Sequence, residues 1–453
     1  MENSYRELTK DIATFTGSNK TPIRVLYDIS VLGAGYHSHW ARTGVYRVAE
    51  NIAFGLNSSQ EIELLCFLGD RLRQIYESLD YLNSPQSLGS TPIIPHLGDL
   101  RYGNQLYEVQ KSLYKLFYSN KLPHAKLILK GLIKGVYATE KKIIQLALNL
   151  EQNNVSKIDI YHSPFKPIPN AIRNYKKIKH FLTVHDLLPI LRPDYFKGNE
   201  DSPAIKAINS LDSDSWIICT SNSTRNDLCN YSNSIDPNKV FVTHLAASDH
   251  FYPNTNPSVL YSVRRKYRIP DSPYILSLCT LEPRKNIQHI VRCFLKIIEQ
   301  EKIPDLNLVL VGSKGWNTDD IFEMISGNSE FAERIILTGY VPEEDLAPLY
   351  SNALVFVYPS FYEGFGLPAL EAMKCGIPVI TSNTSSLPEV VEEAGVMLDP
   401  KDVDGLCHKL WEIYNQPSLR KIMSQKSLTQ AKKFSWEKCV KQTVKAYKVA
   451  ISS

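Results

Sequence analysis

The stretch VFVYPSFYEGFGLPALEAMKCGIPVITSNTSSLPEVV, residues 355–391, is the part of the chain that indicates most about its fold. An apolar, β-branched run ends near Ser360, a loop with two glycines follows, and a helix with a proline in its first turn is expected from about Leu367. Glycine has no Cβ, so the backbone at Gly364 and Gly366 can approach a ligand closely. Free N–H groups at a helix start favour an anion. The stretch therefore predicts a strand–loop–helix unit that binds an anionic ligand such as a diphosphate.

Two carboxylates flank this loop. Glu363 is expected at the end of the strand and Glu371 in the first turn of the helix, so that the turn lets both face one ligand. A carboxylate accepts hydrogen bonds from two adjacent hydroxyls, which suits a sugar ring or a ribose diol. The alternative is that both glutamates only stabilise the helix N-terminus.

Short apolar runs rich in β-branched residues recur along the chain, with helix-length periodic stretches between them. Continuous apolar strands spaced by helices are typical of parallel sheets that are covered on both faces. Both halves of the chain are therefore predicted to be α/β. The expected strands are IRVLYDIS, IELLCFLG, IDIYHSP, KHFLTVHDL, WIICTSN and KVFVTHLA in the first half, and PYILSLCT, LNLVLVGS, RIILTGYV, LVFVYPS and PVITSN in the second.

The two halves are separated by a segment rich in Pro, Asn and Ser, residues 250–273. It has no clear strand, so we expect a domain boundary near Pro257, with domains at 1–256 and 257–433. Residues 434–453 begin with polar and apolar residues alternating at helical spacing, and are expected to pack back across the first domain.

Composition and charge narrow the class of protein. A formal net charge of +4 is small for 453 residues, so charge gives no reason to expect a nucleic-acid partner. No apolar run approaches the roughly 18 residues of a membrane-spanning helix, and the polar N-terminus lacks the apolar core of a secretory signal. The protein is therefore expected in the cytoplasm. The eight cysteines form no C-x-x-C pair, which predicts reduced thiols rather than zinc ligands or disulfides.

The quoted stretch resembles the signature of retaining glycosyltransferase family 4, whose GT-B fold sets two Rossmann-like domains across a cleft. Five segments share the resemblance, particularly to members that transfer mannose-like sugars: RTGVYRVAENI, FLTVHDLLPI, TSNSTRNDL, SLCTLEPRKN and TSNTSSLPEVVEEAGVMLDP. The resemblance implies transfer of a hexose, with mannose favoured, from a nucleotide-diphosphate sugar to a glycan, lipid-linked or other acceptor. GDP-mannose is the favoured donor, and no other cofactor is implied.

The resemblance also implies roles in the second domain. Glu363 would contact hydroxyls of the transferred sugar and Glu371 would hold the ribose. Lys285 would neutralise the departing diphosphate, as a fixed cation does where negative charge develops. The backbone that would cradle the sugar and phosphates belongs to Gly364, Phe365, Gly366 and Leu367.

Four further residues carry implied or open roles. Arg284 either assists its neighbouring lysine or is a surface charge, and Thr280 stands where the family more often has an arginine, which leaves the second positive charge unassigned. Gly44 opens a probable helix whose backbone would approach the diphosphate from the first domain. His185 matches a family histidine near the sugar, although a lone histidine at a strand end is more often structural.

By the same resemblance, no protein nucleophile is expected: the departing phosphate takes the acceptor proton, while the enzyme positions the partners and stabilises charge. No metal is expected, because no cluster has metal-ligand spacing. Asp212 and Asp214 could form the D-x-D of a metal-dependent transferase, but they precede a strand rather than follow one. Gly33 and Gly35 begin a dinucleotide fingerprint in which Ser38 replaces the third glycine. A non-catalytic sugar-nucleotide-binding or scaffold protein of the same fold remains the alternative.

A long helical stretch at residues 71–154 interrupts the strand–helix alternation. Its second part is basic and amphipathic. Such a surface suits binding to the anionic inner face of a membrane, and the alternative is a solvated helical face. The lysines concerned lie between positions 111 and 142: Lys111, Lys115, Lys121, Lys126, Lys130, Lys134, Lys141 and Lys142.

Overall fold

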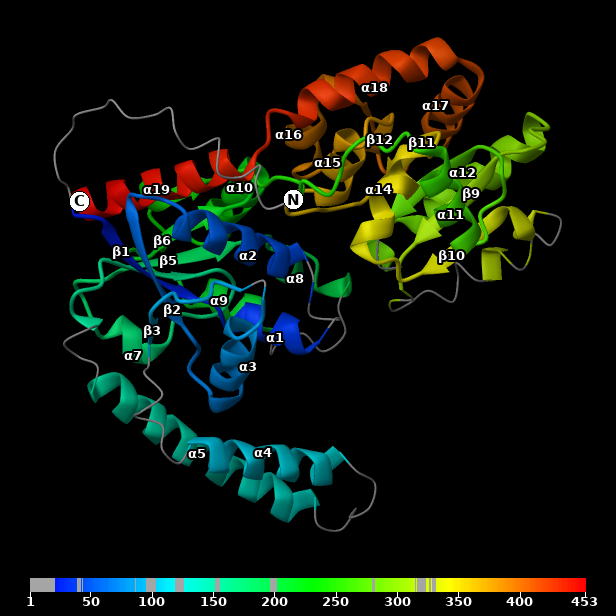
Figure 1. The fold of residues 1–453 in the computed structure, drawn as a ribbon. Coiled ribbons are helices and arrows are strands. Elements are labelled where there is room, and N and C mark those ends of the chain that lie inside the picture. The colour runs from blue at the N-terminus through cyan, green and yellow to red at the C-terminus, as the bar shows by residue number, and fades with distance from the viewer. Residues whose placement is uncertain are drawn as a thin grey trace.

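The computed structural model places two α/β units side by side, with a helical hairpin against the first of them (Figure 1). It describes residues 21–38, 42, 44–85, 87–94, 103–118, 126–150, 155–195, 202–278, 282–313, 315, 323–325, 327 and 331–453.

The first unit is built on a seven-stranded parallel sheet in the order β3-β2-β1-β4-β5-β6-β7. Its strands are buried apolar runs, as parallel sheets with two covered faces require. The strands are β1 (Ile23–Asp28), β2 (Ile62–Phe67), β3 (Ile93–Ile94), β4 (Ile160–Ser163), β5 (Lys179–Val184), β6 (Trp216–Cys219) and β7 (Val240–Val242). The connecting helices outside the hairpin are α1 (Ser30–His37), α2 (Gly44–Asn57), α3 (Leu72–Leu82), α7 (Asn170–Arg173), α8 (Leu188–Leu191), α9 (Pro203–Asn209) and α10 (Asn222–Tyr231).

The second unit is built on a six-stranded parallel sheet in the order β10-β9-β8-β11-β12-β13. Its strands are β8 (Tyr274–Leu278), β9 (Asn307–Val311), β10 (Ile335–Gly339), β11 (Val355–Tyr358), β12 (Val379–Ser382) and β13 (Val396–Leu398). Its helices are α11 (Pro257–Lys266), α12 (Ile287–Gln300), α14 (Glu343–Ser351), α15 (Leu367–Lys374), α16 (Leu387–Val391), α17 (Val403–Asn415) and α18 (Pro417–Ala431). The two sheets confirm the predicted α/β class, and each predicted strand is present.

The candidate dinucleotide fingerprint has a packing role instead. Gly33 and Gly35 lie inside α1, where a Cβ on Gly33 would be 2.4 Å from the backbone nitrogen of Ser78 and one on Gly35 would be 2.1 Å from the ring of Tyr46. These glycines allow α1 to approach α3 and α2, so they do not form a phosphate-binding turn.

The last helix, α19 (Trp436–Ser452), lies against the first unit although it follows the second in sequence (Figure 1). A Cβ on Gly55 of α2 would be 2.3 Å from Val440, which shows how closely the two helices pack. Farther along, the Tyr447 hydroxyl lies 2.6 Å from Nδ1 of the buried His162 on β4. The chain end therefore packs on the first unit.

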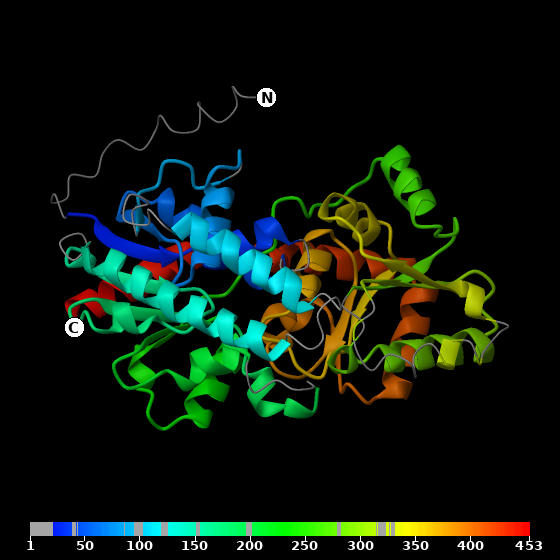
Figure 2. The same cartoon turned by 90° about the horizontal axis from the view of Figure 1, so that it is seen from below.

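The helical stretch forms a hairpin of α4 (Gly103–Tyr118) and α5 (Lys126–Leu150), which crosses in front of the first sheet in Figure 2. Buried Glu140 attaches it to α3, because its carboxylate accepts the backbone N–H of Leu72 at 2.5 Å. Within the hairpin, the same carboxylate accepts Nε2 of Gln110 at 3.2 Å. The rings of Tyr76 and Tyr107 stack with centroids 4.9 Å apart. Among the described residues, no helix is long and apolar enough to span a membrane.

Candidate active site

The glycine loop between β11 and α15 has a backbone that only small residues permit. Gly366 is the N-cap of α15 with φ of 100°, a left-handed conformation that favours glycine. The loop is also held by the segment that follows β12, because Glu363 N–H donates to Ser385 Oγ at 2.9 Å and Ser386 Oγ donates to Glu363 O at 2.8 Å. Its N–H groups at the start of α15 are thus presented on a rigid support.

A buried charge cluster lies at the start of this loop. Lys285 Nζ is 2.7 Å from Glu363 Oε1, Arg284 Nη1 is 3.1 Å from Glu363 Oε2, and Lys285 also donates to the Tyr358 hydroxyl. The lysine and glutamate side chains are only 8% and 9% exposed. Burial alone would raise the pKa of Glu363, but the two cations hold it at about 2. The carboxylate is therefore ionised at every physiological pH.

The lysine is positioned by the turn that follows β8. Pro283–Lys285 form a short 3-10 turn, and Asn286 ends it with φ of 58°. The Asn286 amide donates to Pro359 O at 3.1 Å, while Phe361 N–H donates to Arg284 O at 2.9 Å. Because β8 and β11 are neighbours, these bonds join the two loops at the carboxyl edge of the sheet, where α/β proteins bind ligands.

Glu371 is 1% exposed, and both of its carboxylate oxygens have partners. Oε1 accepts from Arg47 Nη1 at 2.7 Å, and Oε2 accepts from the Tyr350 hydroxyl at 3.2 Å. Arg47 belongs to α2 of the first unit, so this ion pair crosses the cleft. It escaped the sequence prediction, although the arginine stands three residues after Gly44 in one of the five segments.

Two helix N-termini face each other across the cleft. α2 begins at Gly44 and α15 at Leu367, and a Cβ placed on Gly44 would be 3.8 Å from Leu367 Cδ1. Each helix start carries about half a positive charge. In α15 the second residue, Pro368, has no N–H, and the Ala369 N–H donates to Gly366 O at 3.0 Å, so the loop residues before Pro368 supply its backbone donors. The convergence of the two helix starts creates a position that is electrostatically suited to an anion, and Lys285 is paired with Glu363 in the loop that leads into α15.

His185 lies on the other side of the glycine loop. Its Nε2 donates to Pro164 O at 2.8 Å, which leaves Nδ1 as an acceptor in the neutral ring, and burial lowers its pKa. A Cβ on Gly364 would be 2.1 Å from the His185 carbonyl oxygen, so glycine is required at this contact. Thr220 Oγ1 lies 3.0 Å from the His185 oxygen and 3.2 Å from that of Gly364, between the two segments.

A second unpredicted contact across the cleft involves Glu389 of α16. It accepts the backbone N–H groups of Asn222 and Ser223 at 2.8 and 2.7 Å and lies 3.1 Å from His244 Nε2. These hydrogen bonds lower its pKa, although burial opposes them. The carboxylate therefore caps α10 of the first unit from the second.

Most of the predicted site residues come together. Glu363, Arg284 and Lys285 form one cluster, while Phe365 packs its ring inward, 5.8 Å from that of Phe434, and leaves only its backbone to a ligand. Glu371 turns to a different partner, across the cleft. Thr280 lies outside the described residues, so its role stays a prediction.

The alternative metal site has an ordinary turn geometry. Asp212 Oδ1 accepts Asp214 N–H at 3.1 Å and the Ser215 hydroxyl at 2.7 Å, and Asp212 Oδ2 is 3.4 Å from Arg173. Within the part of the chain that the structure describes, no group of three or more His, Cys, Asp or Glu could hold a metal ion. The seven cysteines in that part are free thiols.

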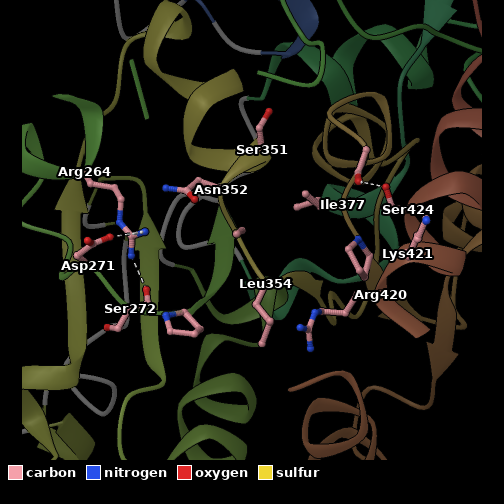
Figure 3. A pocket seen from close by; sticks show the side chains of 14 residues that line it. Arg264, Asp271, Ser272, Ser351, Asn352, Leu354, Ile377, Arg420, Lys421 and Ser424 are labelled. Atoms are coloured by element: carbon pink, nitrogen blue, oxygen red, sulfur yellow. Dashed lines mark hydrogen bonds and ion pairs between the residues drawn. The ribbon is translucent and has the colours of Figure 1, made fainter. Parts of the chain in front are cut away.

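Two cavities lie at different edges of the sheets. One of about 1130 Å³ opens between the units and is lined by Arg47, Tyr46, Tyr340 and Glu343, so it borders the partner of Glu371. Another, of about 550 Å³, is lined by residues of the amino edge of the second sheet, including Arg264 (Figure 3). Only the first cavity adjoins the carboxyl edges, where ligands of parallel sheets bind.

Comparisons with known proteins show which family the chain resembles. The chain matches the glycosyl transferases group 1 family over residues 262–430. O-antigen chain mannosyltransferase B of Escherichia coli is 38% identical over 292 residues, which cover 64% of this chain and 74% of that protein. The serotype-specific mannosyltransferase WbdA of Escherichia coli is 28% identical over 256 residues, 56% of this chain but only 31% of that protein. The structure of Anabaena Alr3699/HepE in complex with UDP and glucose has a TM-score of 0.61 at 14% identity and covers 94% of this chain and 100% of that one, a likeness of fold alone.

Proposed function

This chain belongs to the group 1 glycosyl transferases, a nucleotide-sugar-dependent family with the GT-B fold, and we propose that it transfers mannose from GDP-mannose to a glycan or lipid-linked acceptor of the cell envelope. The proposed transfer retains the configuration at the anomeric carbon and needs no metal ion. Mannose and the envelope acceptor are suggested by the names of the relatives, an O-antigen chain mannosyltransferase and WbdA.

The observation that carries the proposal is the convergence of two helix N-termini, one of which follows the loop whose Glu363 is paired with Lys285. A nucleotide sugar presents a diphosphate, and the starts of α2 and α15 offer it N–H donors from both units. Lys285 would stabilise the charge that develops as the diphosphate departs. Glu371 would hold the ribose diol and Glu363 the hydroxyls of the transferred sugar, since each carboxylate can accept two hydroxyls.

The charge state of Glu363 supports a positioning role rather than acid–base chemistry. A general base works best with a pKa near the working pH, whereas the pKa of Glu363 is about 2. The acceptor proton is therefore assigned to the departing phosphate on the same face of the sugar. His185 would contribute its free Nδ1 as an acceptor for a sugar hydroxyl.

Binding tests the donor assignment first. In a thermal-shift panel of GDP-mannose, other GDP-sugars and UDP-sugars, a donor present at 100 times its Kd should stabilise the protein by about 2.7 kcal/mol. We expect this effect with GDP-mannose. Stabilisation by a UDP-sugar alone would contradict the proposed donor while leaving the family untouched.

Turnover then separates the enzyme from a non-catalytic scaffold. A synthetic mannoside with a hydrophobic aglycone should receive one or more α-linked mannose residues from GDP-mannose, and the linkage can be read by NMR. A β-linked product would contradict retention. Binding of the donor without any transfer to mannosides or to membrane-extracted acceptors would favour the scaffold.

The proposed independence of metal has its own test. A lysine and two helix N-termini occupy the role that a divalent cation has in metal-dependent transferases. Activity should therefore survive EDTA. Complete loss that Mn²⁺ restores would contradict this part of the proposal and return attention to Asp212 and Asp214.

The hairpin surface extends the proposal to a membrane partner. Leu127 and Ile128 at the start of α5 are 83% and 67% exposed, and Leu132 is 52% exposed. Apolar side chains beside basic ones suit the interface of an anionic bilayer. The exposed apolar residues are Val109, Leu116, Leu127, Ile128 and Leu132, and the lysines whose side chains are described are Lys111, Lys115, Lys126, Lys130, Lys134 and Lys142. Lys121 and the Lys141 side chain lie outside the described residues.

Co-sedimentation with vesicles of phosphatidylcholine and phosphatidylglycerol tests this surface. Changing Lys126, Lys130 and Lys134 to Gln should weaken binding on the order of 100-fold at low salt, since each lysine near the surface adds about 1 kcal/mol. The charge-matched control changes Lys421, Lys426 and Lys432 to Gln, three lysines that are exposed on or beside α18 of the second unit. Binding that ignores salt and anionic lipid, or a hairpin that instead mediates self-association in light scattering, would contradict the membrane assignment.

A further inference from the structure

Arg47 makes a contact that the proposed function does not use. It is the fourth residue of α2, and its guanidinium lies 2.7 Å from the carboxylate of Glu371 in the other unit. The two side chains are 30% and 1% exposed. An almost fully buried carboxylate therefore receives its positive partner from across the cleft.

The geometry leaves Glu371 free to bind a diol while Arg47 stays in place. Each carboxylate oxygen can accept two hydrogen bonds. Arg47 uses one position on Oε1 and the Tyr350 hydroxyl uses one on Oε2, so one position remains on each oxygen. Two adjacent hydroxyls need one acceptor each. In hydrogen-bond capacity the ion pair therefore leaves room for a ribose diol, which must reach a carboxylate that is 1% exposed in this structure.

Charge balance gives Arg47 a function in this arrangement. A buried carboxylate without a cation is costly, and it would turn toward other donors or lose its charge. The attraction of Glu371 in turn raises the pKa of Arg47, so the guanidinium remains charged. The Glu343 carboxylate is 3.8 Å away, too far for a hydrogen bond, so Glu371 is the principal partner.

We infer that Arg47 is a positioning residue of the donor site: its ion pair with Glu371 aims that carboxylate at the ribose, and thereby makes donor affinity depend on the first domain. This inference rests on the ribose role proposed for Glu371. The nucleoside is expected to contact the second domain, yet its binding requires a residue of the first. Arg47 lies three residues after Gly44, at which α2 begins, so the same helix would contribute to both the ribose and the diphosphate.

The test is a double-substitution cycle on donor binding and turnover. Arg47→Gln and Glu371→Gln should each raise the KM for GDP-mannose about 10- to 100-fold with kcat little changed, because each removes a charged hydrogen bond that ground and transition states share. The KM of the double variant for GDP-mannose should be no higher than that of the single variant with the higher KM. Arg47→Lys should restore part of the affinity, since it returns the charge but not the fork geometry.

Arg24→Gln is the matched control, because Arg24 forms a 3.0 Å ion pair with Glu63 within the first sheet, away from the cleft. It should leave the donor KM unchanged. A purely structural arginine would lower the unfolding temperature without a KM effect that couples to Glu371. That result would overturn the inference, and so would additive effects of the two substitutions. A lowered KM in Arg47→Gln would also overturn it, because it would mean that Arg47 blocks the ribose.

The cycle also separates this inference from the proposed function. If Glu371→Gln raises the KM and Arg47→Gln does not, only the inference fails. If Glu371→Gln leaves the KM unchanged, the ribose assignment fails and the inference with it. If the wild-type protein neither binds nor turns over any nucleotide sugar, the proposed function itself is wrong.

Discussion

Replacing Lys285 by methionine tests the electrostatic centre of the site most directly. Methionine keeps an unbranched apolar side chain of similar length and removes only the ammonium group. In the structure that group lies 2.7 Å from Glu363 Oε1 and also contacts the Tyr358 hydroxyl. If it stabilises the departing diphosphate, its loss should slow the chemical step more than it weakens folding.

The expected magnitudes come from two separate effects. Removing a donor that acts on developing charge typically costs about 10²–10³ in rate, or roughly 2.7–4 kcal/mol. For folding, the pKa of Glu363 near 2 instead of the ordinary 4.5 corresponds to about 3 kcal/mol of stability. A depressed carboxyl pKa stabilises above the unfolded pKa, and that stability is lost as the pH falls from 4.5 toward 2. Because Arg284 remains 3.1 Å away, Lys285→Met should lose only part of it.

The measurements are kcat at saturating donor and urea unfolding at pH 7 and pH 4. We expect a kcat reduced at least 100-fold, a loss of less than about 3 kcal/mol at pH 7, and acid unfolding that begins at a higher pH than in the wild type. Lys426→Met, at an exposed position of α18, controls for the removal of one lysine from the same domain. A variant with near-normal kcat would remove Lys285 from the reaction, and a loss of activity that matches the unfolded fraction would make its role structural.

The remaining predictions concern the loop. Glu363→Gln should lower kcat with a smaller change in KM, because a carboxylate beside the transferred sugar matters more as the ring gains positive character, whereas Glu371→Gln should mainly raise the donor KM. Steady-state kinetics at saturating acceptor distinguish the two, and wild-type behaviour of both would leave them as structural ion-pair partners of Lys285 and Arg47. Gly364→Ala should cost about 1–3 kcal/mol in urea unfolding and reduce kcat, since the new Cβ would lie 2.1 Å from the His185 oxygen. Unchanged stability would show that the backbone at His185 moves away from the new Cβ at little cost in free energy.

The fold was largely predictable because its signals are local. The apolar runs of both halves became strands, and α15 begins at Leu367 as its proline and glycines predicted. The strand before it ends at Tyr358, two residues earlier than expected, and Glu371 is the fifth residue of its helix rather than in the first turn. β3 and β13 were not predicted, because β3 has two residues and the three residues of β13 stand between Gly395 and Asp399, without the longer apolar run that marked the three-residue β7.

The partners within the site were less predictable, for a physical reason. The glutamates and Lys285 stand in recognisable motifs, but ion pairing depends on which loops meet at the edge of a sheet. Arg47 and Glu371 are 324 positions apart in sequence, so no periodicity relates them. The only available signal was that Arg47 shares a motif with Gly44. Its partner became evident once α2 and α15 were seen to face each other.

The contacts across the cleft have one further consequence. The carbonyl oxygen of Gly364, in the loop assigned to the sugar, lies 3.2 Å from Thr220 Oγ1 of the first unit, and the neighbouring Tyr362 hydroxyl donates to Asp227 at 2.6 Å. Glu389 adds hydrogen bonds to the start of α10. The segment that would hold the donor is thus also a segment that holds the two units together. An opening of the cleft at this segment would break these hydrogen bonds, so their loss is part of the free-energy cost of separating the two units.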